Sequence, residues 1–191
     1  MKRIGVENLS KIIVLVGASG SGKTTIGKEL EKHGVENLLS FTTREQRSGE
    51  QHMVDYRFIG DVELGHQILL DNVVEMTKYN GNTYGLLKRD VEYIMSSGSD
   101  VYFICDKNGA EQISKMYPEQ CTQFFIKIDM ETMMDRMLKR GDDVDSVLKR
   151  IYHAYIKDEL KAPLGSFVLN SKYFNAVENA ECILNCIGVD E

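Results

Sequence analysis

Eight consecutive residues near the start of the chain have the types and spacing of a phosphate-binding loop, G-x-x-x-x-G-K-[ST]. They are Gly17, Ala18, Ser19, Gly20, Ser21, Gly22, Lys23 and Thr24. In such a loop, backbone N–H groups and the positive end of the following helix point at one place where a phosphate chain can sit. Lys23 would reach the β/γ-phosphates, and the Thr24 hydroxyl would bind Mg²⁺. The motif therefore predicts a nucleotide-binding site.

The apolar run that precedes the loop, residues 12–16, makes the motif more specific than its letters alone. A phosphate-binding loop lies between a buried strand and a helix. Residues 22–33 supply that helix, because Ile26 and Leu30 repeat at helical spacing and Gly34 provides a stop. The alternative, a glycine- and serine-rich turn that carries Lys and Thr by chance, does not explain this context.

Strand-like runs and helical patterns alternate along much of the remaining chain. Strands are expected at residues 11–16, 101–105, 123–128 and 167–169, and a helix at residues 91–95 precedes the second of them. Strands that alternate with helices imply a parallel sheet covered on both faces. In such sheets, ligands bind beyond the carboxyl ends of the strands, and the phosphate loop lies at one of those ends.

Residues 35–85 interrupt this alternation and are predicted to form an inserted subdomain. Within them, residues 56–59 read as a short strand, residues 61–70 as a short helix and residues 73–76 as another extended piece, followed by turn chemistry at residues 80–82. The segment therefore reads as an insertion and not as a continuation of the main sheet.

The segment at residues 130–161 is strongly charged and largely helical, with a break at residues 140–143. Two helices joined at that break could move as a lid. The predicted fold class is therefore α/β, with a P-loop NTPase-type parallel sheet, helices on both faces, an inserted small subdomain and a helical lid.

The overall composition is that of an ordinary globular protein. A chain of 191 residues suits one domain, and a net charge of −6 argues against a general nucleic-acid binder. No segment approaches the ~18 to 20 consecutive apolar residues that a membrane span needs. The first ten residues lack an apolar core of signal-peptide length, so a cytoplasmic location is expected. The sequence does not predict an oligomeric state.

A second informative segment is Ser40-Phe41-Thr42-Thr43-Arg44-Glu45-Gln46-Arg47-Ser48-Gly49-Glu50, followed by Asp55-Tyr56-Arg57-Phe58. Together with the phosphate loop, it closely resembles the guanylate kinase family, which has T-T-R-x-x-R-x-G-E followed by D-Y-x-F at this distance from its P-loop. The resemblance covers nearly the whole chain. Further matches are Glu75, Tyr84-Gly85, Asp106, Asn108-Gly109-Ala110, Arg140-Gly141, Arg150 and Asn170.

This resemblance implies an ATP-dependent kinase that phosphorylates GMP or dGMP directly, with Mg²⁺ as cofactor and with nucleotides, not nucleic acid or membrane, as partners. It implies a core at residues 1–34, 86–129 and 162–191, a nucleoside-monophosphate-binding subdomain at residues 35–85 and a lid at residues 130–161. The implied ATP-binding residues are the phosphate loop, Thr25 and Asn170. The implied acceptor-binding residues are Ser40, Arg44, Arg47, Glu50, Tyr56, Glu75, Tyr84 and Asp106. The implied catalytic residues are Lys23, Arg44, Arg140 and Arg150.

Residue chemistry supports several of these roles. Arg44 and Arg47 lie three residues apart in a polar segment, which suits two guanidinium forks on one phosphate, although two solvated surface arginines are the alternative. Glu75 lies in a mostly apolar stretch, where an ionised carboxylate is costly unless it gains donors. A guanine edge offers two donors, N1–H and the exocyclic amine. The resemblance implies that Glu75 binds this edge and that Ser40 bonds the base near O6.

The positively charged residues around the break at 140–143 are ambiguous, because most charge runs are solvated helix faces. Phosphoryl transfer, however, spreads negative charge over the transferred group, and kinases neutralise that charge with arginines. Arg140 and Arg150 match the lid positions of the family and are therefore favoured over Lys139 and Lys149.

The chain departs from the family pattern at three places. Leu86 replaces the Ser or Thr that follows Tyr-Gly, Ile104 replaces the first carboxylate of D-I-D, and the stretch between Arg140 and Arg150 is one residue shorter. These departures motivate two alternatives. The chain could phosphorylate another nucleoside monophosphate or a phosphorylated metabolite. It could also be a catalytically weak module that binds a phosphopeptide or protein.

Overall fold

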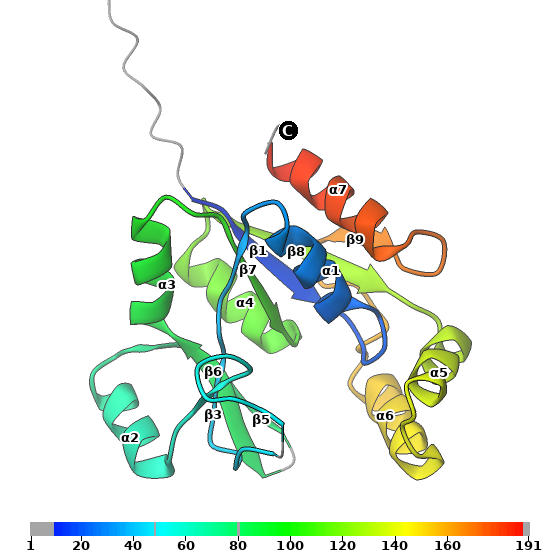
Figure 1. Cartoon of the computed structure of the whole chain (residues 1–191), viewed down its shortest axis with the longest axis horizontal. Coiled ribbons are helices and arrows are strands. Elements are labelled where there is room, and N and C mark those ends of the chain that lie inside the picture. The colour runs from blue at the N-terminus through cyan, green and yellow to red at the C-terminus, as the bar shows by residue number, and fades with distance from the viewer. Residues whose placement is uncertain (1–9, 48, 80, 189–191) are drawn as a thin grey trace, which may run out of the picture.

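The computed structural model describes residues 10–47, 49–79 and 81–188. Ser48, the Asn80 of the expected turn and the N-terminal residues on which the expectation of location depends lie outside this part. Two sheets and the helices around them make up the described chain (Figure 1).

The larger sheet has five strands in the order β2-β7-β1-β8-β9, and every pair of neighbours is parallel. The strands are β1 (Ile12–Val16), β2 (Glu36–Asn37), β7 (Val101–Cys105), β8 (Cys121–Lys127) and β9 (Phe167–Asn170). Parallel pairing requires long crossover connections, and the intervening helices supply them. All carboxyl ends therefore meet at one edge of this sheet.

The apolar run of β1 is buried because helices cover both faces of the sheet. Ile12, Val14 and Val16 pack into a core that α3 (Lys88–Ser96) and α4 (Lys107–Met116) close. Ile13 and Leu15 face the opposite side. There α1 (Lys23–Glu31) and α7 (Ala176–Ile187) cover them.

The smaller sheet has the order β4-β3-β6-β5, and its strands lie in the connection between β2 and β7. Its strands are β3 (Phe41–Thr42), β4 (Arg57–Phe58), β5 (Val73–Tyr79) and β6 (Asn82–Leu87), and α2 (Asp61–Leu69) packs beside them. Phe41, Ile59, Leu64 and Leu87 form its separate apolar core. The small sheet also shares the core of the main sheet, because Val74 of β5 and Leu86 of β6 pack with β1 and β7, and α4 contacts β5.

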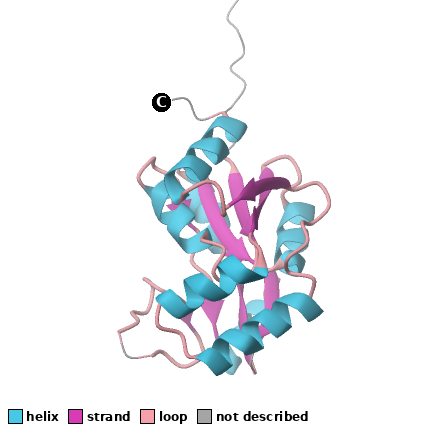
Figure 2. Ribbon diagram, turned by 90° about the vertical axis from the view of Figure 1, so that its right-hand side faces the viewer, coloured by secondary structure: helices cyan, strands magenta, loops and turns pink. Residues whose placement is uncertain are grey.

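Helices α5 (Met130–Lys139) and α6 (Val144–Ile156) form a third unit. Met133, Met137 and Val147 pack with Ala18 of the phosphate loop. Figure 1 shows this pair on the opposite side of the molecule from the small sheet, and in Figure 2 the pair lies in front of the small sheet.

These observations confirm the predicted α/β fold with a parallel sheet and helices on both faces. The predicted break at residues 140–143 separates α5 from α6. Strand β6 was not predicted, because the turn chemistry around residue 81 hid the strand that follows it. The extended piece at residues 73–76 is longer than predicted, since β5 runs to Tyr79. Among the described helices, none combines the length and apolar character that a membrane crossing needs.

Candidate functional site

The phosphate loop joins the carboxyl end of β1 to α1, as its sequence predicts. Gly17, Gly20 and Gly22 have positive φ angles of 154°, 77° and 98°. A Cβ at Gly17 would lie 2.7 Å from the carbonyl oxygen of Ile126, so this close approach of two strands requires glycine. Gly22 precedes α1 without a side-chain cap. The first N–H groups of α1 are therefore free to bind an anion.

Lys23 folds back over this loop. Its Nζ donates hydrogen bonds to the carbonyl oxygens of Gly17 at 2.6 Å and Ala18 at 2.9 Å. Burial lowers the pKa of Lys23 to about 8, although the nearby charge of Glu159 opposes the shift. A phosphate bound at the loop would give the Lys23 ammonium group a negatively charged partner.

A cavity of about 440 Å³ lies beside the loop. Its lining includes Ser19, Gly20, Ser21, Gly22, Lys23, Thr24 and Thr25 of the predicted ATP site, together with Arg136, Arg140, Ser171, Phe174, Asn175 and Asn179. Ala18 instead packs against α5 and α6. Asn170 is not in the described lining, and its Oδ1 accepts a hydrogen bond from the backbone N–H of Lys172 at 3.1 Å.

Arg136 is a residue of this cavity that the sequence reasoning missed. Its Nη1 donates to the Gly20 carbonyl oxygen at 3.3 Å and to Ser171 Oγ at 3.2 Å, and its Nη2 donates to the Ser171 carbonyl oxygen. It thereby connects α5 to the phosphate loop and to the turn after β9. The available signal was its spacing, because Arg136 lies one helical turn before Arg140.

A second cavity of about 760 Å³ lies between the small sheet, the end of β7 and α6. All eight predicted acceptor-binding residues line it: Ser40, Arg44, Arg47, Glu50, Tyr56, Glu75, Tyr84 and Asp106. Arg150, which comes from α6, lines the same space. The fold therefore brings together residues that are up to 110 positions apart in the chain.

Arg44 is held in place inside this cavity by charge and by aromatic rings. Its guanidinium donates to both carboxylate oxygens of Glu50, at 2.8 and 3.0 Å. The Arg44 Cζ lies 5.6 Å from the ring centroids of Tyr56 and Phe58. The bond from Arg44 lowers the pKa of the Glu50 carboxyl, which also accepts the Arg47 backbone N–H at 2.9 Å. Glu50 thus orients Arg44 and the loop that follows it.

Glu75 lines the same cavity and is only 3% exposed. Its Oε2 has no hydrogen-bond partner among the described residues. Burial, and then the charge of Asp106, raise the pKa of Glu75 to about 8. Glu75 pairs with Leu86 across the two strands, next to a register shift that begins at Val73. A buried carboxyl oxygen without a partner is costly for the fold, which points to a ligand that supplies hydrogen-bond donors.

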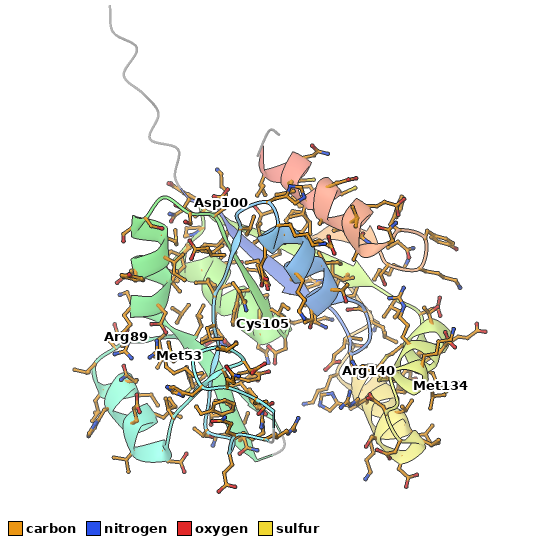
Figure 3. The ribbon with its side chains drawn as sticks, in the orientation of Figure 1. Met53, Arg89, Asp100, Cys105, Met134 and Arg140 are labelled. Atoms are coloured by element: carbon orange, nitrogen blue, oxygen red, sulfur yellow. The ribbon has the colours of Figure 1, made fainter. Side chains whose placement is uncertain are left out.

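Asp106 begins α4 and is fixed by two donors. Its Oδ1 accepts the Gly109 backbone N–H at 2.8 Å, and its Oδ2 accepts the Thr77 hydroxyl at 3.0 Å. Thr77 lines the cavity as well. The sequence reasoning missed it, because only the extension of β5 beyond residue 76 places Thr77 on the same face of the strand as Glu75. Figure 3 places the neighbouring Cys105 near the centre of the molecule, at the carboxyl end of β7.

The departures at Leu86 and Ile104 have different surroundings. Leu86 is fully buried with Phe103 in the apolar core below Glu75. No hydroxyl from position 86 is available there. Ile104 lines the wall between the two cavities, in a space of about 180 Å³ that also contains Lys23 and Asp106. Asp106 is therefore the acidic group that strand β7 presents at this junction.

Arg150 connects the two cavities. Its Nη1 donates to Ser19 Oγ in the phosphate loop at 3.3 Å, and it also lines the larger cavity. Arg140 lines the cavity beside the phosphate loop. A phosphorylated molecule at each site would have its phosphates at the junction formed by Lys23, Arg150 and Asp106. The arrangement suits transfer of a phosphoryl group from one bound molecule to another.

Comparison with known proteins agrees with this geometry. The family model described as guanylate kinase matches residues 9–173. A guanylate kinase of Clostridium perfringens is 33% identical over 187 residues, which cover 96% of this chain and 87% of that protein. A guanylate kinase of Mycoplasma genitalium is 32% identical, and the match covers 95% of this chain and 78% of that protein.

Solved structures show the same relationship. The crystal structure of guanylate kinase from Anaplasma phagocytophilum superposes with a TM-score of 0.67 at 25% identity, and covers 94% of this chain and 85% of that chain. A gluconokinase from Sinorhizobium meliloti has a TM-score of 0.52 at 14% identity over 94% of this chain and 93% of that chain, which shows a shared fold alone. The chain belongs to the guanylate kinase family.

Proposed function

We propose that this protein transfers the γ-phosphoryl group of ATP to the phosphate of GMP or dGMP. The observation that supports this function best is Glu75, a buried carboxyl whose Oε2 lacks a partner among the described residues and which lines the same cavity as Arg44 and Arg47. The cavity therefore suits a molecule that joins a base with two donors to a phosphate.

Recognition of guanine follows from the chemistry of Glu75. The ionised carboxylate accepts the N1–H and the exocyclic amine of guanine, which no other common base presents together on one edge. Ser40 lines the same cavity and can bond the base near O6. Because the pKa of Glu75 is about 8, the free site holds mostly the protonated acid at neutral pH. Binding of guanine therefore releases a proton from Glu75.

Recognition of the acceptor phosphate is assigned to Arg44, Arg47, Tyr56 and Tyr84. The rings of Tyr56 and Tyr84 meet edge to face at 5.9 Å, which places both phenols next to Arg44. The guanidinium groups supply positive charge, and the phenols donate neutral hydrogen bonds. Glu50 contributes by holding the fork of Arg44 in one orientation.

Transfer needs no covalent intermediate with the protein. The acceptor phosphate oxygen attacks the γ-phosphoryl group in line, and negative charge spreads over the transferred oxygens. Lys23 stabilises this charge from the phosphate loop, and Arg140 and Arg150 stabilise it from the α5–α6 side. Arg44 holds the attacking group.

The donor chemistry of the loop fits Mg²⁺. Thr24 is exposed and lines the cavity beside the phosphate loop. The described residues contain no group of three or more His, Cys, Asp or Glu side chains that could hold a metal by themselves. Mg²⁺ commonly takes few protein ligands and completes its shell with phosphate oxygens and water. When bound, Mg²⁺ neutralises phosphate charge, and Thr24 is the protein residue that would hold it.

We assign binding of the acceptor to residues 35–85 and closure to residues 130–161, with the core formed by residues 1–34, 86–129 and 162–191. The position of α5 and α6 opposite the small sheet supports this division (Figure 1). Closure of the two units over the junction would exclude water and limit ATP hydrolysis.

Mg²⁺-dependent ADP formation from ATP, with GMP, dGMP, AMP, CMP, UMP and dTMP supplied in turn, tests the proposed function. Selective turnover with GMP or dGMP is the expected result. Turnover with a different acceptor would mean that Leu86 and Ile104 have changed the specificity. Tight ATP binding without turnover of any acceptor would refute the proposal and favour another phosphorylated substrate or a binding module.

A further inference from the structure

The connection between α5 and α6 places one carboxylate against both lid arginines. Asp142 Oδ1 accepts a hydrogen bond from Arg140 Nε at 3.2 Å, and its Oδ2 accepts one from Arg140 Nη2. The same Oδ2 accepts a hydrogen bond from Arg150 Nη1 at 3.1 Å. Asp142 is therefore shared between the residue that ends α5 and a residue two turns into α6.

The backbone around Asp142 is fixed by the end of α5. Gly141 has a φ of 92° and donates its N–H to the Leu138 carbonyl oxygen at 2.9 Å. The Asp142 N–H donates to the Met137 carbonyl oxygen at 3.1 Å. This pair of bonds is a Schellman motif, which ends a helix and reverses its chain. The short connection thus holds Asp142 beside Arg140 without an additional residue.

The Asp142 carboxylate has no other task in the described structure. The next residue, Asp143, supplies the cap of α6, because its Oδ1 accepts the Ser146 backbone N–H at 2.9 Å. The described partners of the Asp142 side chain are Arg140 and Arg150. The bond from Arg140, with the charge of Arg150, keeps the pKa of Asp142 below its usual value, so this carboxylate is charged at neutral pH.

Charge explains what this arrangement accomplishes. Two guanidinium groups repel each other, and the repulsion grows as they approach the same phosphoryl group. A carboxylate between them offsets this repulsion and keeps the two forks together. Arg150 also bonds Ser19, so the whole cluster is connected to the phosphate loop. Figure 3 shows Arg140 on the inner side of the helix pair and Met134 on its outer side.

We propose that Asp142 is a positioning residue that holds Arg140 and Arg150 as a pair facing the phosphate loop, so that both reach the same transferred phosphoryl group. This inference rests on the proposed phosphotransfer. The Asp142 side chain is 19% exposed, whereas those of Arg140 and Arg150 are 54% and 39% exposed. Ion pairs with such exposed partners contribute little to folding stability, so their loss should act on the orientation of the arginines.

The test compares Asp142→Asn with Asp143→Asn in the full chain. Both substitutions remove one negative charge from the same connection, and Asn at position 143 still caps α6. We expect Asp142→Asn to lower kcat by about ten-fold, while KM for GMP changes by less than about two-fold, because disordered arginines weaken the transition state more than the ground state. Asp143→Asn should retain the wild-type kcat, and Asp142→Glu should recover part of the loss.

A second readout does not depend on activity. In the ¹H–¹⁵N NMR spectrum, the Nε–Hε signal of Arg140 should be protected from exchange in the wild type and in Asp143→Asn, and should lose that protection in Asp142→Asn. Equal kcat for the two Asn variants, or a higher kcat for Asp142→Asn, would overturn the proposal. Unchanged Arg140 protection in Asp142→Asn would overturn it even if the wild type proved inactive with GMP, an outcome that would separately refute the proposed function.

Discussion

Replacement of Glu75 by Gln should make the protein more stable and much less active. Glu75 is 3% exposed, and its pKa rises from 4.5 to about 8 on folding. Between these two pH values the unfolded chain binds fewer protons at this position than the folded chain. Stability therefore falls as the pH rises through this window, and the buried carboxyl destabilises the protein at neutral pH.

The magnitude follows from the same two pKa values. Each pH unit inside the window costs up to about 1.4 kcal/mol, so raising the pH from about 5 to about 7.5 should remove roughly 3 kcal/mol of the wild-type unfolding free energy. Glu75→Gln cannot ionise and should not show this loss. In a chain of this size, a difference of roughly 3 kcal/mol corresponds to ~6 to 12 °C in Tm.

Urea unfolding at both pH values measures the effect, with Glu63→Gln as a matched control because Glu63 is exposed on α2. The control should follow the wild type. At the same time, kcat/KM for GMP should fall by ~30- to 1000-fold in Glu75→Gln, since an amide cannot accept two hydrogen bonds with a full negative charge. Wild-type kcat/KM for GMP should also rise as the pH increases through about 8.

The reasoning would be refuted if Glu75→Gln lost stability with pH as steeply as the wild type, because Glu75 would then not be the group that titrates on folding. It would also be refuted if the variant phosphorylated GMP normally. The opposite signs of the two effects distinguish a carboxyl kept for binding from one kept for structure, since a structural residue would lose both stability and activity.

Three further predictions concern residues around the same site. In Gly109→Ala, the new Cβ would lie 2.9 Å from Glu75 Oε2 and 3.0 Å from Cys105 Cβ, so KM for GMP should rise by about ten-fold with an unchanged KM for ATP, and an unchanged KM for GMP would contradict this reasoning. In Thr77→Val, Asp106 loses a donor worth ~0.5 to 1.5 kcal/mol, so steady-state kinetics should show a KM for GMP raised by ~2- to 10-fold, and no change would contradict this role of Thr77. Because the pKa of Lys23 is about 8, wild-type kcat/KM for ATP should fall as Lys23 loses its proton above that pH, and a flat profile up to about pH 9 would show that the Lys23 ammonium group is not required for ATP capture.

The features that the sequence predicts well are those set by local patterns. The phosphate loop and the break between α5 and α6 depend on short motifs of glycine, charge and apolar spacing, and the structure has them at the predicted places. Strand β1 reads as a continuous apolar run because both of its faces are buried. The order of strands and helices along the chain was enough to indicate the parallel sheet.

Features that depend on contacts between distant segments could not be predicted in this way. Thr77 reaches Asp106 only because α4 packs beside β5, and Arg136 reaches Ser171 across 35 residues of sequence. Strand β6 was hidden because its glycine and asparagine neighbours favour a turn. Gly81 does keep a turn conformation, with a φ of 80°, but pairing with β3 and β5 extends the residues from Asn82 onward. Tertiary pairing outweighed local preference there.

The shortened connection between Arg140 and Arg150 illustrates the same limit. From the sequence, a missing residue changes the register of the lid. In the structure, the turn at Gly141 that follows α5 absorbs the change, and both arginines reach Asp142. Counting residues along the chain could not show this outcome, because it depends on the backbone conformation of one glycine.

Comparison of GMP with IMP as acceptors tests the central claim most directly, since IMP retains N1–H and lacks only the exocyclic amine. If Glu75 recognises both donors, kcat/KM for GMP should exceed that for IMP by ~10- to 150-fold, which corresponds to one hydrogen bond to a charged group of ~1.5 to 3 kcal/mol. The difference should become much smaller in Glu75→Gln, because the amide oxygen can accept a hydrogen bond but carries no full negative charge. Equal kcat/KM values for GMP and IMP in the wild type would contradict the assignment of Glu75 as the residue that selects guanine.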